Sequence, residues 1–217
     1  MESQVRGGTR WKRFAVVMVP SVAATAAIGV ALAQGALAAS FSVSGQEFKV
    51  SADKLVGHDF TQYGALDTGK DLEGKDAAHP VAVSAFETAS ITNMCQSVVT
   101  PVPFLNKQIT LKLTAGNKGK DVQASKLYID VANLDADQAV FDNMDIGVAA
   151  GSAKGPKPKA EEYQGKKANP FGFAQQADTA TLTGVHQTAW ATTAGTFTLS
   201  NLHMGLQWGS GAGIECY

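Results

Sequence analysis

The chain contains few of the residues on which metal sites and cofactor sites depend. Only two cysteines and four histidines occur among its 217 residues. None of the histidines shows the H-x-H or H-E-x-x-H spacing that places two metal ligands on one face of an element. No Gly-rich phosphate loop follows a strand and opens a helix. The sequence therefore predicts no metal site and no cofactor.

A serine nucleophile is also missing from the places where one is expected. An α/β-hydrolase carries G-x-S-x-G at a sharp strand-to-helix turn. In the closest stretch, Trp208 and Ala212 replace the two glycines around Ser210. We therefore predict no catalytic residues. An esterase stays open as an alternative, with a triad that combines a distant serine with His186 or His203.

Charge is absent from residues 14–39, and four basic residues precede this run: Arg6, Arg10, Lys12 and Arg13. This order is typical of segments that enter a membrane. Ala36-Leu37-Ala38 fits the small-residue rule for signal cleavage, whereas residues 14–33 alone would span about 30 Å of bilayer. We predict that residues 1–39 are a signal peptide or an N-terminal membrane anchor.

Residues 40–217 are then an extracytoplasmic domain, either secreted or anchored with a cytoplasmic N-terminus. No later apolar run is long enough to span a membrane. Without residues 1–38, 14 basic residues face 18 acidic ones, a net charge of −4 that argues against a nucleic-acid partner. Cys95 and Cys216 predict one disulfide, because exported thiols are usually oxidised.

Helix signals are scarce after Ser40, and short segments alternate apolar and polar residues. Such alternation predicts half-buried strands of an antiparallel sheet. We expect an all-β domain that forms a single curved sheet, a sandwich or an open barrel. The segments are Phe41–Val43, Phe48–Val50, Ile109–Leu113, Leu127–Val131 and Phe197–Asn201.

Several polar or proline-containing stretches predict loops. Residues 67–79 are charged and contain glycine, Pro101-Val102-Pro103 would end a ladder, and residues 117–120 predict a turn. Residues 151–170 form the longest predicted loop, rich in lysine and proline. A surface or lipid contact is one hypothesis for it and a solvated linker is the other. The candidate contact residues are Lys154, Lys157, Lys159, Lys166, Lys167, Phe171 and Phe173.

Four segments share the pattern apolar-x-apolar-x-Asn-apolar. Their asparagines are Asn93, Asn133, Asn143 and Asn201. Because asparagine tolerates left-handed backbone angles and can bond its own main chain, the pattern predicts a repeated bend or bulge. A row of asparagines that binds a ligand is the alternative hypothesis.

Several stretches give the chain a family likeness. They are Arg10–Phe14, Gly35–Phe41, Val43–Gln46, Asn93–Val98 and Glu215–Tyr217. On them the chain resembles a family of exported proteins of unknown function from Streptomyces and related actinobacteria. Some members carry the label cholesterol esterase. The resemblance implies export and implies no mechanism.

The sequence thus favours a non-enzymatic protein of the cell envelope. We expect it to contact lipid or another envelope component through an apolar concavity of the sheet. Two alternatives stay open, namely a lipid or cholesterol-type esterase and a surface protein that self-associates through sheet edges. The predicted partners are a membrane, through residues 14–33 if they are retained, and a lipid or envelope polymer.

Overall fold

The computed structural model describes residues 18, 44–159 and 168–217. The chain divides into two units, Met1–Phe41 and Ser42–Tyr217. The predicted leader therefore lies outside the described residues, apart from Met18. Among the residues described, no helix is long and apolar enough to cross a membrane.

The described part of the domain is all-β, and ten strands form one antiparallel sheet. A single 3₁₀ turn, Ala150–Ser152, follows the seventh strand. The strands are β1 (Phe48–Lys70), β2 (Asp76–Thr92), β3 (Met94–Val102), β4 (Lys107–Ala115), β5 (Val122–Asp135), β6 (Gln138–Asp142), β7 (Asp145–Ala149), β8 (Phe173–Thr193), β9 (Thr196–Thr198) and β10 (His203–Trp208).

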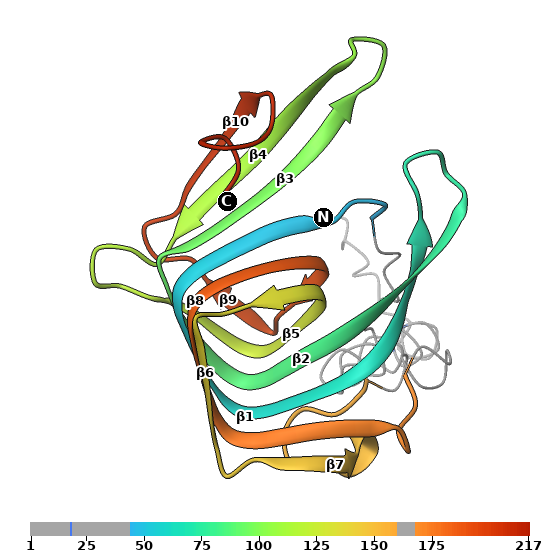
Figure 1. Cartoon of the computed structure of the whole chain (residues 1–217), viewed down its shortest axis with the longest axis vertical. Helices are drawn as coiled ribbons and strands as arrows, with labels where there is room; N and C mark the ends of the chain where they lie inside the picture. Colours follow the sequence, from blue (N-terminus) through green and yellow to red (C-terminus); the bar gives the residue numbers. More distant parts are fainter. Residues whose placement is uncertain (1–17, 19–43, 160–167) are drawn as a thin grey trace, which may run out of the picture. The chain divides into compact units, whose positions relative to one another are not determined.

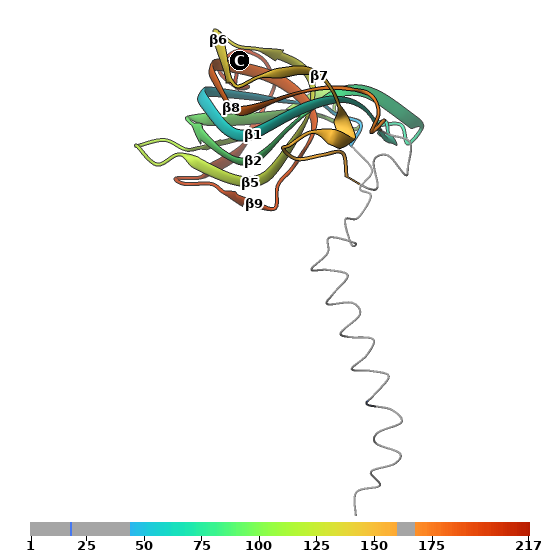
Figure 2. The ribbon, with the colours of Figure 1, turned by 90° about the horizontal axis from the view of Figure 1, so that it is seen from below.

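Four of the strands make a closed circuit of pairings. Strand β1 pairs with β2, β2 with β5, β5 with β8, and β8 again with β1. We call these four strands the body. They curve around one another in Figure 1, and Figure 2 shows the same arched strands from below. We call β3, β4 and β10 the flap, because they extend the sheet beyond β1 in the order β10-β4-β3-β1.

Backbone irregularities let the long body strands bend without breaking. Asp59 in β1 and Lys126 in β5 have φ values of 53° and 48°, in the left-handed region. At Asp59 the register with β8 passes from His58–Thr179 to Phe60–Ala177. The register is therefore the same on both sides of Asp59, and the left-handed residue bends the strand without adding a residue to it. The 23-residue β1 can therefore wrap around the core.

The buried side chains form two clusters. The larger lies among the body strands and includes Leu55, Phe60, Phe86, Leu127 and Val185, together with Met94 at the start of the flap. The smaller consists of Tyr63, Val81, Val83, Ala150, Ala168 and Ala174. Residues 150 and 168 thus bring the long loop onto the sheet.

Most of the predicted strands are confirmed, Phe41–Val43 lies outside the described residues, and two predicted loops are wrong in part. Pro101 and Val102 of β3 pair with Gln108 and Lys107 of β4, so the predicted break begins only at Pro103. The segments at Phe48–Val50, Ile109–Leu113 and Leu127–Val131 lie in β1, β4 and β5, whereas only the start of Phe197–Asn201 is in a strand. The predicted loop at residues 67–79 is a hairpin whose turn covers residues 71–75 only, and the Lys70 and Asp76 side chains form a 2.6 Å ion pair across it.

The prediction that the repeated asparagines mark bends is confirmed. Asn93, Asn143 and Asn201 have φ values of 49°, 54° and 54°. Asn133 lies instead at a register shift between β5 and β8. The Asn143 side-chain amide donates to Asp178 (2.8 Å), and that of Asn201 donates to the Asn117 carbonyl (2.8 Å). These bonds hold bends in the sheet, so the asparagines have structural partners.

Candidate functional site

An apolar cavity lies inside the curve of the body. Its volume is about 400 Å³, within the roughly 300–1,000 Å³ range of small-molecule sites. Aliphatic and aromatic side chains supply most of the lining, and three polar residues complete it. The lining residues are Phe48, Val50, Ala52, Leu55, Ile91, Met94, Gln96, Leu127, Ile129, Val185, Gln187, Thr192, Ala194 and Phe197.

A second, smaller cavity of about 40 Å³ continues the first toward the middle of the body. The two share four lining residues: Leu55, Ile129, Val185 and Gln187. The smaller cavity is also lined by Phe60, Phe86 and Phe141. The centroid of the Phe60 ring lies 5.3 Å from that of Phe86 and 5.3 Å from that of Phe141. The two cavities therefore adjoin, and aromatic rings line part of the smaller one.

The other end of the larger cavity reaches solvent. Thr192 is exposed there, and Phe48, Gln96, Ala194 and Phe197 are half-buried. Deeper residues such as Leu127 and Val185 are almost fully buried. An entering molecule would thus meet a mouth with amide and hydroxyl groups before it reached an apolar interior.

The cavity is also electrically neutral. Within residues 44–159 and 168–217, no charged side chain lines either cavity. An unpaired charge in so apolar a space would lose several kcal/mol of solvation. The site thus suits a hydrocarbon chain or ring system, with any charged group left at the mouth.

The C-terminal tail covers one face of the flap, which we call the back face. The Cys95 and Cys216 sulfur atoms lie 2.05 Å apart, the distance of a disulfide, which agrees with the predicted pairing. The Cys216 amide donates to Ser97 Oγ (3.1 Å), and Thr110 Oγ1 donates to the Gly209 carbonyl (2.7 Å). Ser97 and Thr110 are buried as a result.

Charged groups also hold the tail in place. Lys49 Nζ lies 2.8 Å from Glu215 Oε2, and Lys112 Nζ donates to the Glu215 carbonyl (2.9 Å). The hydrogen bond from Lys49 holds the pKa of Glu215 below its usual value. Burial raises the pKa of the Tyr217 phenol, whose ring packs edge-on against His186 at 4.7 Å. This back face is filled by the chain itself.

The predicted contact residues of the long loop lie apart from the cavity. The structure describes Lys154, Lys157 and Lys159, whereas Lys166 and Lys167 lie outside the described residues. Lys154 Nζ is 3.9 Å from Asp145 Oδ2, and Lys159 Nζ lies 4.3 Å from the centroid of the Tyr128 ring. The aromatic pair next to the loop, Phe171 and Phe173, is exposed. Their contact with lipid stays a prediction.

The described part of that loop follows the sheet closely. Pro156 and Pro158 are buried, and the Lys154 amide donates to Gln176 Oε1 (2.7 Å). A Cβ on Gly155 would lie 2.3 Å from the Asp59 carbonyl oxygen, so glycine is needed for this approach. Residues 153–159 therefore form part of the packed surface.

The sheet register brings one serine to a histidine suggested for an esterase, because His186 of β8 lies opposite Ser51 of β1 and Asp135 of β5. Ser210 Oγ donates to Gln108 Oε1 (2.7 Å), and the His186 ring packs on Tyr217. His203 lies on β10 opposite Thr114. Among the residues that the structure describes, no cluster of three His, Cys, Asp or Glu side chains could hold a metal ion.

The sequence predicted an apolar concavity but did not identify its lining. Val185 and Gln187 belong to β8, whose threonine- and glutamine-rich sequence gave little strand signal. The sequence did contain one usable signal, because Val185, Gln187 and Ala189 are spaced by two and would all face inward on a strand. Phe48–Val50 was the one predicted strand segment that contributes both of its apolar residues to the lining.

The comparisons with known proteins give a family and no activity. No curated protein and no solved structure matches the chain. A family model matches residues 44–217, and it is described as a family of unknown function (DUF6230). These residues include all ten strands, both cysteines and the whole cavity lining. The chain therefore belongs to the DUF6230 family.

Proposed function

We propose that this protein is a non-enzymatic lipid-binding protein of the cell envelope, and that the cavity inside the body holds the apolar part of the lipid. The cavity itself carries the proposal. It is largely apolar and uncharged, it adjoins a second small cavity, and it has amide and hydroxyl groups where its lining is most exposed. Burial of a hydrocarbon chain there would be favourable by about 0.8 kcal/mol per CH₂ group.

An extracytoplasmic location is supported by two independent features. Residues 14–39 carry no charge and follow four basic residues, as expected for a membrane-targeting segment. Cys95 and Cys216 lie at disulfide distance, and disulfides persist mainly in oxidising compartments. Whether the leader is removed or retained as an anchor can be decided from the intact mass of the natural protein.

The binding proposal is tested with purified full-length protein. Lipid extraction followed by mass spectrometry should recover an apolar ligand, and the emptied protein should bind cis-parinaric acid, a fluorescent fatty acid. In the variant Val185→Phe the larger ring would occupy the space between the two cavities. We expect its affinity for cis-parinaric acid to fall at least tenfold.

Val140→Phe is the matched control. Val140 lies on β6 with its side chain exposed, so the same substitution there should leave binding unchanged. Equal fluorescence in Val185→Phe and in the unaltered protein would show that the probe binds elsewhere. Repeated recovery of lipid-free protein that also binds no cis-parinaric acid would refute the proposal.

A further inference from the structure

We infer that the uncovered face of the flap is a docking surface for an anionic lipid bilayer. We call it the front face, opposite the back face that the C-terminal tail covers. The inference deepens the proposed function, since it supplies the surface from which a lipid would reach the cavity. It rests on the register of the flap strands, the exposure of their tip and the distribution of charge.

Register places the front face on the same side of the sheet as the cavity lining. Gln96 of β3 lies opposite Val50 of β1, and both line the cavity. Gln96 also lies opposite Leu113 of β4, which in turn pairs with Met204 of β10. Because directly opposed residues point to the same face, Leu113 and Met204 continue the cavity wall outward. Leu113 indeed packs against the core cluster of the body.

The same register extends the apolar surface to the end of the flap. Leu206 and Trp208 follow Met204 at intervals of two residues, and they lie opposite Leu111 and Ile109. Leu206 and Trp208 are 67% and 64% exposed. Large apolar side chains in such a row mark an interaction surface on a soluble domain. The back face of the same strands, in contrast, is occupied by the tail.

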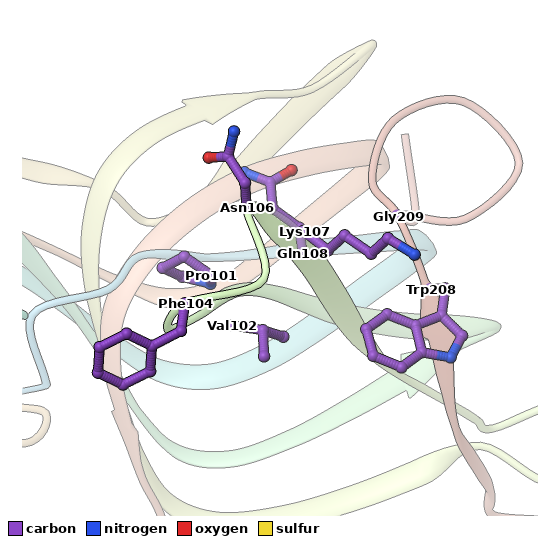
Figure 3. A pocket seen from close by; sticks show the side chains of 8 residues that line it. All are labelled: Pro101, Val102, Phe104, Asn106, Lys107, Gln108, Trp208 and Gly209. Atoms are coloured by element: carbon purple, nitrogen blue, oxygen red, sulfur yellow. The ribbon is translucent and has the colours of Figure 1, made fainter.

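The tip of the flap carries the most exposed aromatic residue of the described chain. Phe104 is 106% exposed and has a φ of 67°, and Leu105 beside it is also exposed. Phe104, Trp208 and Lys107 line an open hollow of about 770 Å³, which Figure 3 shows with Phe104 and Trp208 on opposite sides. Lys107 Nζ lies 5.8 Å from the centroid of the Trp208 ring. Tryptophan and lysine favour the interfacial zone of a bilayer, while a phenylalanine can enter it.

Charge identifies the partner as an anionic surface. Residues 94–120 contain four lysines and no aspartate or glutamate. Lys107 lies on the front face beside Trp208, Lys118 and Lys120 lie in the turn after β4, and Lys112 contacts the tail on the back face. The acidic residue of the tail, Glu215, is paired with Lys49 on the back face. Each basic residue near an anionic lipid surface contributes about 1 kcal/mol of attraction at low salt. The continuity of the front face with the cavity lining favours a lipid bilayer over a second copy of this domain.

The test uses two full-length proteins with one tryptophan each, so that any leader effect is common to both. Trp11→Phe with Trp190→Phe leaves Trp208, and Trp11→Phe with Trp208→Phe leaves Trp190. Trp190 stacks on His79 at 3.5 Å, away from the flap. Vesicles of phosphatidylglycerol and phosphatidylcholine with brominated chains should quench Trp208 at least threefold more than Trp190. Removal of phosphatidylglycerol, or high salt, should weaken the quenching.

Two variants of the Trp208 protein locate the contact. Phe104→Ser with Leu105→Ser should abolish most of the quenching, whereas Phe171→Ser should not. Phe171 is 89% exposed on another loop, so it matches Phe104 in exposure and chemistry. Circular dichroism confirms that each variant keeps its β fold. Loss of quenching with Phe171→Ser instead would overturn the inference and favour the loop at residues 151–170.

Other results also separate the possibilities. Equal quenching of the two tryptophans overturns the docking surface, and so does a stable dimer in which Trp208 is shielded from vesicles. The cavity is judged independently by extraction and by cis-parinaric acid. Preferential quenching of Trp208 with an empty cavity would support the docking surface and refute the lipid-binding function. A lipid-filled cavity without preferential quenching of Trp208 would support the lipid-binding function and refute the docking surface.

Discussion

The body and the flap belong to one sheet, but a buried core stabilises the body, whereas the C-terminal tail and its disulfide stabilise the flap. Each body strand has partners along both of its edges, and its inward side chains are buried in a common core. The flap joins the body through only three residue pairs, from Lys49–Ser97 to Ser51–Cys95. Its stability therefore depends on the tail and the disulfide on its back face.

This difference explains how the flap can keep an exposed apolar face. A sheet needs one covered face for stability, and the other can remain available for a partner. In the flap the tail supplies that cover, because Cys216, Ser97 and Thr110 take part in the contacts on the back face. The front face can therefore remain exposed without loss of the fold.

The largest expected effect concerns the crosslink between the tail and the flap. Cys95→Ser with Cys216→Ser removes a bridge across 121 residues. Chain entropy then predicts a loss of roughly 4–5 kcal/mol in the free energy of unfolding. Urea unfolding followed by circular dichroism measures the loss. Limited proteolysis should cut the tail of the variant before the body, and an unchanged urea midpoint would show that the tail contacts alone fix the flap.

The next effect tests packing in the body. A Cβ on Gly57 of β1 would lie 2.1 Å from Cδ1 of the buried Phe86 ring. We expect Gly57→Ala to lower the free energy of unfolding by about 1–3 kcal/mol through overpacking. Gly64→Ala on the same strand is the control, because no described atom would lie within 4 Å of its Cβ. Calorimetry of the two variants compares them, and equal melting temperatures would contradict the tight contact.

A smaller effect is expected at the link between body and flap. Asn93 joins β2 to β3 with a φ of 49°, and its side-chain amide donates to Asp53. Asn93→Ala should cost about 1–2 kcal/mol, because alanine is strained in the left-handed region. Asn93→Gly should cost less. Asn133→Ala is the control, because Asn133 lies at a register shift and has no left-handed φ. Urea unfolding compares the two variants, and an equal loss in the free energy of unfolding would argue against backbone strain at Asn93.

Local rules predicted one strand of the flap, β4, and parts of two body strands, β1 and β5. Strand β4 alternates clearly, and the turn at residues 117–120 has the Asn-Lys-Gly-Lys composition of a turn, so both were predicted. The length of β1 and β8 was not, because left-handed residues such as Asp59 interrupt the alternation of buried and exposed side chains. A strand whose alternation is interrupted in this way loses its period-two signal along the sequence.

The sequence predicted an apolar site but not the residues that line it. Alternation indicated one apolar face, and an apolar concavity was the expected consequence. The lining, however, combines Leu55, Leu127 and Val185 from strands far apart in the chain, and only the pairings of β8 with β1 and β5 bring them together. Such long-range pairing is not encoded in any short segment. The cysteine pair was predictable because the chain contains only these two cysteines.

The smallest effect is electrostatic and concerns the ion pair that attaches the tail to the body. The Lys49 hydrogen bond lowers the pKa of Glu215 from its usual value of 4.5. A carboxyl whose pKa is lower in the folded state contributes stability above its unfolded pKa, and that contribution is lost as the pH falls through the folded value. Glu215→Gln should therefore lower the free energy of unfolding by about 0.5–1 kcal/mol at pH 7. Its difference from the unaltered protein should shrink below pH 4.5 in parallel urea titrations, whereas a difference that grew on acidification would mean that Glu215 is held by its neutral form.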